Sequence, residues 1–179
     1  MLSGCAERRR WLAFEPAYSA YAELCAKVLR SGCEAWVVPI ALPLAGRDGL
    51  AEIKYDLGRP GQPGYRLRDD IDWRVKHRGT NVPYFQPACL TRLDTAVQQY
   101  RLPSPHHLRL SSAASALQVL AGAPATLASA TMKSVCVHAE GTDEASVVDA
   151  LAGHGWRQCS RDTAAAGVHL VFVRENGSS

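Results

Sequence analysis

The chain lacks every short motif that would assign a catalytic activity with high specificity. It has no glycine-rich loop of the kind that cradles phosphates and no Cys-x-x-Cys pair. A nucleotide-binding loop and a structural zinc site are therefore not expected. The six cysteines are scattered and no secretion signal is visible, so we expect reduced thiols and a cytoplasmic location. No apolar run approaches the length that spans a bilayer, and a membrane partner is not expected either.

The chain also lacks a strong excess of charge of either sign. Its formal net charge is +3 over 179 residues, and 47% of the residues are hydrophobic. Such values are typical of a globular protein with one ordinary core or two small parts that share an interface. They are compatible with a polyanionic partner but do not identify one.

The clearest pattern lies in the last third of the chain, where residues 132–174 predict a compact β-α-β-β unit. Residues 134–138 alternate between apolar and polar side chains, as half-buried strands do. Residues 168–173 form a continuous apolar run, which indicates a central strand covered on both faces. Trp156 and Phe172 are expected in the core, because aromatic side chains dominate the energy of small cores.

The first 121 residues predict a separate part built around a central antiparallel hairpin with flanking helices, so the whole chain is assigned to the α+β class. The expected elements are helices over 16–30, 88–100 and 111–121, and strands over 34–44, 50–57 and 65–77. The small-residue stretch 122–131 is expected to link the two parts, and 175–179 to be a polar tail.

The charged face of the central hairpin is the first candidate site. With its loop centred near residues 61–62, the hairpin would pair charged residues across its strands: Asp56 with Arg68, Lys54 with Asp70, and Glu52 with Asp72. Facing carboxylates repel each other, and a bound cation would relieve that repulsion. The preferred interpretation is nevertheless a solvated sheet face with ordinary ion pairs.

Glu52-Ile53-Lys54 resembles the E-x-K spacing of the metal-dependent nucleases of the PD-(D/E)xK class. The resemblance covers these three residues only, and the aspartate expected on the preceding strand is missing. It implies that Glu52 would hold Mg²⁺ or Mn²⁺ and that Lys54 would steady the attacking water. Asp70 and Asp72, which the predicted strand pairing places on the same face, would complete the site. On this alternative the protein is a metal-dependent phosphodiesterase acting on nucleic acid.

A basic run on the second strand of the hairpin is the second candidate. Its cations would contact phosphates and mark a nucleic-acid-binding face: Arg66, Arg68, Arg74, Lys76 and Arg78. Three aspartates in the same run, Asp69, Asp70 and Asp72, weaken its positive field. Nucleic acid is therefore the second partner class that we consider, after protein.

Two histidine patterns carry weaker signals. His106 and His107 are adjacent, but adjacent histidines need distant partners before they can hold a metal ion. Gly167-Val168-His169 resembles the Gly-x-His of the small HicA-type RNA-cleaving toxins, with Val168 where that family has serine. That resemblance would imply RNA cleavage, whereas we interpret His169 as a buried or half-buried strand residue.

These residues favour a non-catalytic binding protein with a regulatory or assembly role over an enzyme. No catalytic residue, metal ligand or cofactor is assigned on this interpretation, and Mg²⁺ or Mn²⁺ enters only with the nuclease alternative. A protein partner is expected. The sequence leaves the identity of that partner and the oligomeric state open.

Overall fold

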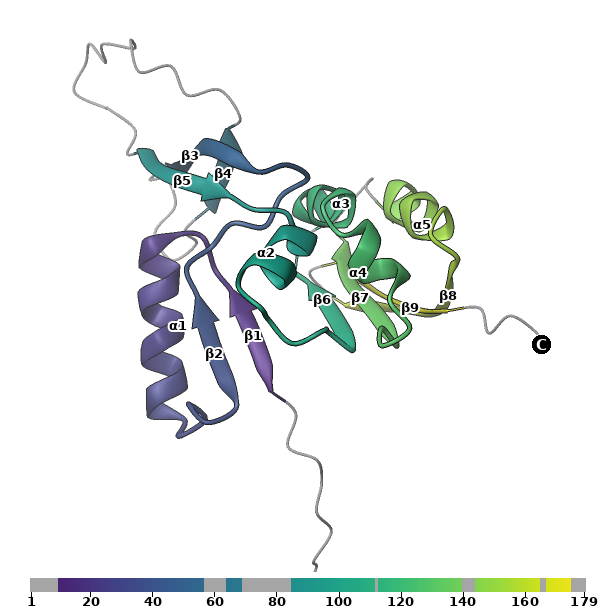
Figure 1. Cartoon of the computed structure of the whole chain (residues 1–179), viewed down its shortest axis with the longest axis horizontal. Coiled ribbons are helices and arrows are strands. Elements are labelled where there is room, and N and C mark those ends of the chain that lie inside the picture. The colour runs from purple at the N-terminus through teal and green to yellow at the C-terminus, as the bar shows by residue number, and fades with distance from the viewer. Residues whose placement is uncertain are drawn as a thin grey trace, which may run out of the picture. The chain divides into compact units, whose positions relative to one another are not determined.

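The structure is a computed structural model that describes residues 10–56, 64–68, 85–111, 113–139, 144–164 and 167–174. The chain is an α+β protein, as the sequence predicts, and it divides into two compact units (Figure 1). Unit 1 comprises residues 1–43 and 49–90, and unit 2 comprises residues 44–48 and 91–179. None of the helices in the described part of the chain is long and apolar enough to cross a bilayer.

Unit 1 begins with a β-α-β arrangement. Strand β1 (Trp11–Phe14) leads into helix α1 (Tyr18–Arg30), and strand β2 (Val37–Ile40) then runs parallel to β1. Gly32 follows the helix at φ +61°, a left-handed conformation that glycine adopts without strain. The helix confirms the prediction over 16–30, whereas β1 was not expected and β2 is shorter than the predicted 34–44.

A three-stranded antiparallel sheet makes up the rest of the described part of unit 1. Its strands lie in the order β4-β3-β5: β4 (Gly64–Arg68), β3 (Gly49–Asp56) and β5 (Phe85–Leu90). Ile53 of β3 and Ala88 of β5 are buried against Ala17, the residue before α1. The central antiparallel sheet with a flanking helix is therefore confirmed, with one more strand than the predicted hairpin.

Two element boundaries in this region differ from the prediction. The helix expected over 88–100 is α2 and begins only at Leu93, because residues 85–90 pair with β3 as a strand. Pro87, which was expected in the first turn of that helix, lies exposed on β5. An edge strand tolerates proline, since one of its edges needs no donor. The predicted strand 65–77 is described only as far as Arg68.

Gln86 fastens α1 to the three-stranded sheet. Its side chain is 2% exposed, accepts a hydrogen bond from the Tyr18 amide at Oε1 (3.1 Å) and donates from Nε2 to the Pro16 carbonyl oxygen (2.8 Å). The N-cap residue Ala17 has no side chain that could accept an amide proton. A distant strand therefore supplies the acceptor that the start of α1 lacks.

Unit 2 is built on a four-stranded mixed sheet in the order β6-β7-β9-β8, with β6 parallel to β7 and β9 antiparallel to both of its neighbours. The strands are β6 (His107–Leu110), β7 (Ser134–Ala139), β8 (Trp156–Ala164) and β9 (Gly167–Arg174). Together with helix α5 (Glu144–Ala152), β7, β8 and β9 confirm the predicted β-α-β-β unit. The sequence did not predict β6.

Helices cover one face of this sheet (Figure 1). Helix α3 (Ala113–Ala121) and α5 pack against it through a cluster of buried aliphatic residues that includes Leu170 and Phe172 of β9. The alternate residues of β9, Val171 and Val173, point to the other face and are only half-buried. β9 is central as predicted, but the described residues of unit 2 cover only one of its faces.

The stretch 122–131 is packed structure and not the expected linker. It contains helix α4 (Pro124–Ala128), and Leu127 is fully buried in the core cluster of unit 2. Asp94 of helix α2 (Leu93–Gln99) accepts hydrogen bonds from the amides of Ala125 and Thr126, each at 2.8 Å. The short helix α4 is therefore held by a carboxylate from another helix.

Residues 44–48 belong to unit 2, although the chain reaches them between two strands of unit 1. Asp48 accepts hydrogen bonds from the Arg92 amide (2.9 Å) and the Thr95 hydroxyl (2.9 Å), both at the start of α2. The hydrogen bond from the Arg92 amide is the main cause that lowers the pKa of Asp48. Asp48 thus caps α2 from a remote position in the sequence.

Candidate functional site

The charged face of the predicted hairpin is described at Glu52 and Lys54. Both lie on β3 and alternate with Ala51 and Ile53, which are buried. Glu52 is half-buried and Lys54 is exposed, so these two side chains lie on the outer face of the sheet. The structure places these two residues of the nuclease alternative on one strand, as the E-x-K spacing requires.

The register of β3 against β4 differs from the prediction. Glu52 lies opposite Arg68, where Asp72 was expected, so the pairing is shifted by four positions along the second strand (72 − 68 = 4). Lys54 lies opposite Arg66, where Asp70 was expected. The facing carboxylates that motivated a cation at this sheet are not found at Glu52.

This register places two cationic residues, Lys54 and Arg66, at directly facing positions of an antiparallel pair. Like charges at facing positions destabilise a sheet unless a counter-charge lies between them. Two residues along, the register places Glu52 and Arg68, residues of opposite charge, at facing positions.

The other predicted site residues cannot be placed, because they lie outside the described residues: Asp70 and Asp72 of the nuclease alternative, and Arg74, Lys76 and Arg78 of the basic face. Across the residues that are described, no group of three or more histidine, cysteine, aspartate or glutamate side chains is arranged to hold a metal ion. The nuclease alternative and the extended basic face both stay predictions.

The parallel pair of β1 and β2 (the β1–β2 pair, residues 11–14 and 37–40) is a surface that the sequence did not reveal. Every residue of the two strands is apolar, and none of them is buried. Within the described part of the chain, each strand has the other as its only strand neighbour. Parallel strands are ordinarily covered on both faces and lie within larger sheets.

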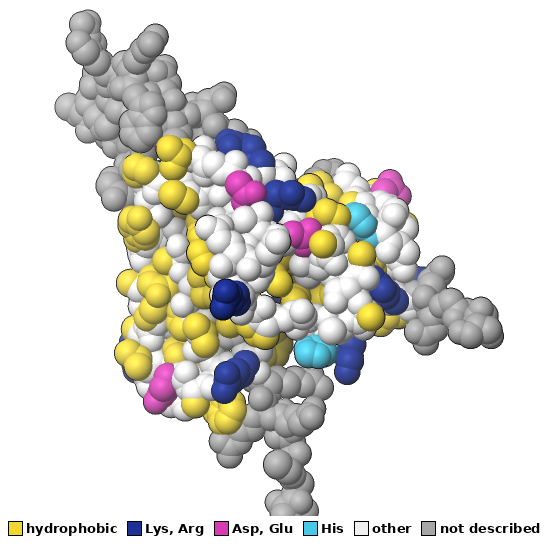
Figure 2. Space-filling view, in the orientation of Figure 1, with side chains coloured by type: hydrophobic (Ala, Val, Ile, Leu, Met, Phe, Trp, Pro, Cys, Tyr) yellow, Lys and Arg dark blue, Asp and Glu magenta, His cyan; other side chains and the backbone are white. Residues whose placement is uncertain are grey.

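Exposed apolar side chains are concentrated in the same unit. The large hydrophobic residues that the described structure leaves exposed are Trp11, Tyr18, Leu29, Val38, Leu50 and Tyr100, and all of them except Tyr100 belong to unit 1. Figure 2 shows apolar side chains spread over the region of α1 and β2. Apolar side chains grouped on a surface are typical of sites that bind other proteins.

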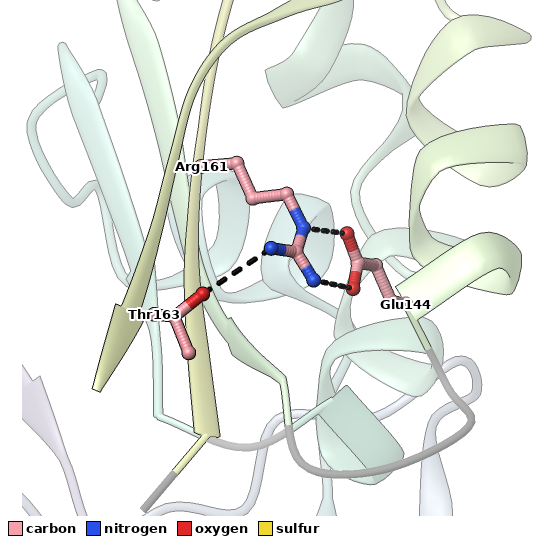
Figure 3. Close-up of polar contacts among 3 residues, drawn as sticks. All are labelled: Glu144, Arg161 and Thr163. Atoms are coloured by element: carbon pink, nitrogen blue, oxygen red, sulfur yellow. Dashed lines mark hydrogen bonds and ion pairs between the residues drawn. The ribbon is translucent and has the colours of Figure 1, made fainter. Parts of the chain in front are cut away.

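A cluster of three polar side chains joins helix α5 to the edge strand β8 in unit 2 (Figure 3). Arg161 of β8 donates from Nε and Nη2 to the two carboxylate oxygens of Glu144 in the first turn of α5 (2.7 and 3.1 Å). Its Nη1 donates to the Thr163 hydroxyl (3.2 Å). The hydrogen bond from Arg161 is the main cause that lowers the pKa of Glu144, and the cluster ties α5 to β8.

The cysteines of the described residues are free thiols: Cys25, Cys33, Cys89, Cys136 and Cys159. This confirms the expectation of unpaired cysteines for these five positions.

Comparison of the chain with protein-family models, with curated proteins and with solved structures finds no match.

Proposed function

We propose that this protein is a non-catalytic assembly partner that binds another protein through the β1–β2 pair. The observation that supports the proposal best is a parallel pair of wholly apolar strands without a single buried residue. Trp11 is 50% exposed and Val38 is 45% exposed. The free cysteines suit a cytoplasmic location, which is part of the proposal.

The physical argument rests on backbone edges as well as on apolar area. A strand edge without a neighbour presents free N–H and C=O groups, and another chain can pair with them as an additional strand. Apolar side chains beside such an edge are removed from water when the partner binds, at roughly 25 cal/mol per Å². A partner that adds a strand beside β1 or β2 would satisfy both needs.

Photo-crosslinking tests the proposal and captures the partner in the same experiment. A photoreactive phenylalanine analogue is placed at Val38 in the full chain and irradiated in the cells that produce the protein. The matched control carries the same group at Tyr100, an exposed apolar residue of unit 2 (53% exposed). We expect an adduct of discrete mass from position 38 only, and we expect Trp11→Ser to reduce its yield.

Two outcomes would contradict the proposal. Equal adducts from positions 38 and 100 would indicate general stickiness of exposed apolar groups. The absence of any adduct from position 38, with the protein folded as judged by circular dichroism, would remove the β1–β2 pair as a binding surface.

A second, independent role is contact with nucleic acid at the hairpin, which the facing of Lys54 and Arg66 favours. A phosphate between these positions would offset their repulsion. We expect Lys54→Gln with Arg66→Gln to flatten the salt dependence of oligonucleotide binding, with the slope falling by about 0.7–0.9 for each phosphate contact that is lost. Arg109→Gln with Lys133→Gln, two exposed cations of unit 2, serves as the control. An unchanged slope, or no binding at low salt, would exclude this role.

A further inference from the structure

Two histidines of unit 2 face each other across the sheet. His138 on β7 and His169 on β9 occupy directly opposed positions in the antiparallel register. Their ring centroids are 4.6 Å apart, and the ring planes are inclined by 40°. Both side chains are half-buried and lie on the face of the sheet opposite α3 and α5, because Val137 and Leu170, their sequence neighbours, belong to the core cluster.

Gly167 allows the ring of His138 to take this position. A Cβ atom at residue 167 would lie 3.0 Å from Cε1 and 3.2 Å from Nε2 of His138, so a side chain there would crowd the imidazole. The same Cβ would lie 2.6 Å from the Ala139 carbonyl oxygen, and the residue has φ +142°. Cε1 and Nε2 of His138 therefore lie beside Gly167 on β9, two residues before His169, while Nδ1 of His138 is buried.

We propose that His138 and His169 together bind one divalent transition-metal ion, with Zn²⁺, Ni²⁺ and Cu²⁺ as the class of ligand. Imidazole nitrogen is a preferred ligand of these ions, and affinity for such a site rises from Ni²⁺ to Cu²⁺. Two imidazoles in ring contact from adjacent strands can each direct one nitrogen to a shared ion. The rigid sheet sets their spacing before the metal arrives.

A carboxylate lies beside the histidine pair. Asp162 of β8 lies directly opposite His169 on the side away from His138, and the Ser160 hydroxyl donates to its Oδ2 (3.0 Å). A carboxylate beside a ligating histidine orients the ring and raises its basicity as a ligand. The described residues supply no third ligand, since they contain no metal-holding group of three. The remaining coordination positions would be filled by water or by an added anion.

Histidine NMR of the full chain tests this site without any mutation. The chain has six histidines, so its ¹⁵N-histidine spectrum is simple enough to follow ring by ring. On addition of one equivalent of Zn²⁺, we expect the imidazole signals of His138 and His169 to shift together and the other signals to stay in place. Shifts confined to the adjacent pair His106 and His107, or spread over all the rings, would overturn the proposal and indicate an adventitious ion only.

Substitutions provide the second measurement. His138→Asn and His169→Gln should each raise the Kd for Ni²⁺, measured by calorimetry, by more than about tenfold, because a single imidazole cannot chelate. The matched controls are His107→Asn and His154→Asn, which replace exposed rings of the same unit and should leave the Kd unchanged. If one of the two site variants fails to fold, the other and the NMR experiment still decide. An unchanged Kd in a folded site variant would exclude the site.

Discussion

The two units differ in how they treat their large apolar residues. Unit 2 collects them in one buried cluster between its sheet and helices, in which Val137, Leu151 and Phe172 are fully buried. In unit 1 the described cluster consists of Ile53 and two alanines, while several larger side chains lie on the surface. Unit 2 therefore has a larger buried core than the described part of unit 1. Unit 1 exposes apolar surface in its described residues, and the proposed binding role rests on that surface.

The largest expected effect is the difference in unfolding free energy between two Phe→Ala substitutions, one in each unit. Phe172→Ala removes a fully buried ring from the core of unit 2 and should lower the free energy of unfolding by about 3–5 kcal/mol. Phe14→Ala removes a half-buried ring from β1 and should cost only about 1 kcal/mol. Denaturant titration measures both. Equal losses would mean that the two units do not differ in the way described.

A polar residue tests how unit 1 is held together. Gln86→Ala removes, at a position that is 2% exposed, the side chain that binds the Tyr18 amide and the Pro16 carbonyl oxygen, and should cost about 1–3 kcal/mol in the same titration. Gln98→Ala, at an exposed position of α2, is the control and should be nearly neutral. A neutral Gln86→Ala would show that α1 does not depend on its link to β5.

The cap on α4 offers the corresponding test in unit 2. Asp94→Ala removes the acceptor of two amide hydrogen bonds and should cost about 0.5–2 kcal/mol. Asp94→Asn keeps one acceptor oxygen and should cost less. If the asparagine variant were as unstable as the alanine variant, the charge near the helix terminus and not the hydrogen bond would be the stabilising feature.

A smaller effect depends on pH. Arg161 lowers the pKa of Glu144 in the folded protein, so the carboxylate contributes stability above pH 4.5, its ordinary pKa, and loses it as pH falls through the lowered value. Melting temperatures of the wild type and of Glu144→Gln should therefore differ at neutral pH and converge in acid. A difference that persists at the lowest pH would rule out the ion pair as its cause.

The smallest effect is expected at the outer face of β3. Glu52→Gln and Lys54→Ala should each change the free energy of unfolding by less than about 1 kcal/mol, because charges on a solvated sheet face contribute little. Calorimetric titration with Mg²⁺ and with Mn²⁺ completes the test. Heat from a single site that disappears in Glu52→Gln would favour the nuclease alternative over a non-catalytic protein.

The sequence predicted the long periodic elements well. It predicted poorly the short elements and the position of a proline that suits both a helix and a strand. The alternation through Val135 and Val137 and the apolar run that contains Phe172 indicated the C-terminal unit, because both patterns extend over most of a strand. β1 and β6 were not predicted, because four residues are too few to show a period. Pro87 was misplaced because proline suits both the first turn of a helix and an edge strand.

The sites were harder to predict than the fold, since they depend on register and on partners remote in sequence. The shift that places Arg68 opposite Glu52 could not be derived, because several turns fit a loop rich in glycine and proline. The pairing of His138 with His169 depends on which strands become neighbours. Alternation predicts the face of the sheet to which a residue points, but it does not predict the residue that lies beside it.

The capping of α2 by Asp48 also governs how the protein can be divided. The backbone passes between the two units three times, at 43/44, 48/49 and 90/91, so a single proteolytic cut would not release either of them. A fragment that begins at residue 91 would contain the whole sheet of unit 2 but would lack the carboxylate that caps its first helix. During synthesis, residues 44–48 leave the ribosome before residues 91–95, so the hydrogen bonds of Asp48 form only after α2 has been made. The two units are therefore interleaved along the chain.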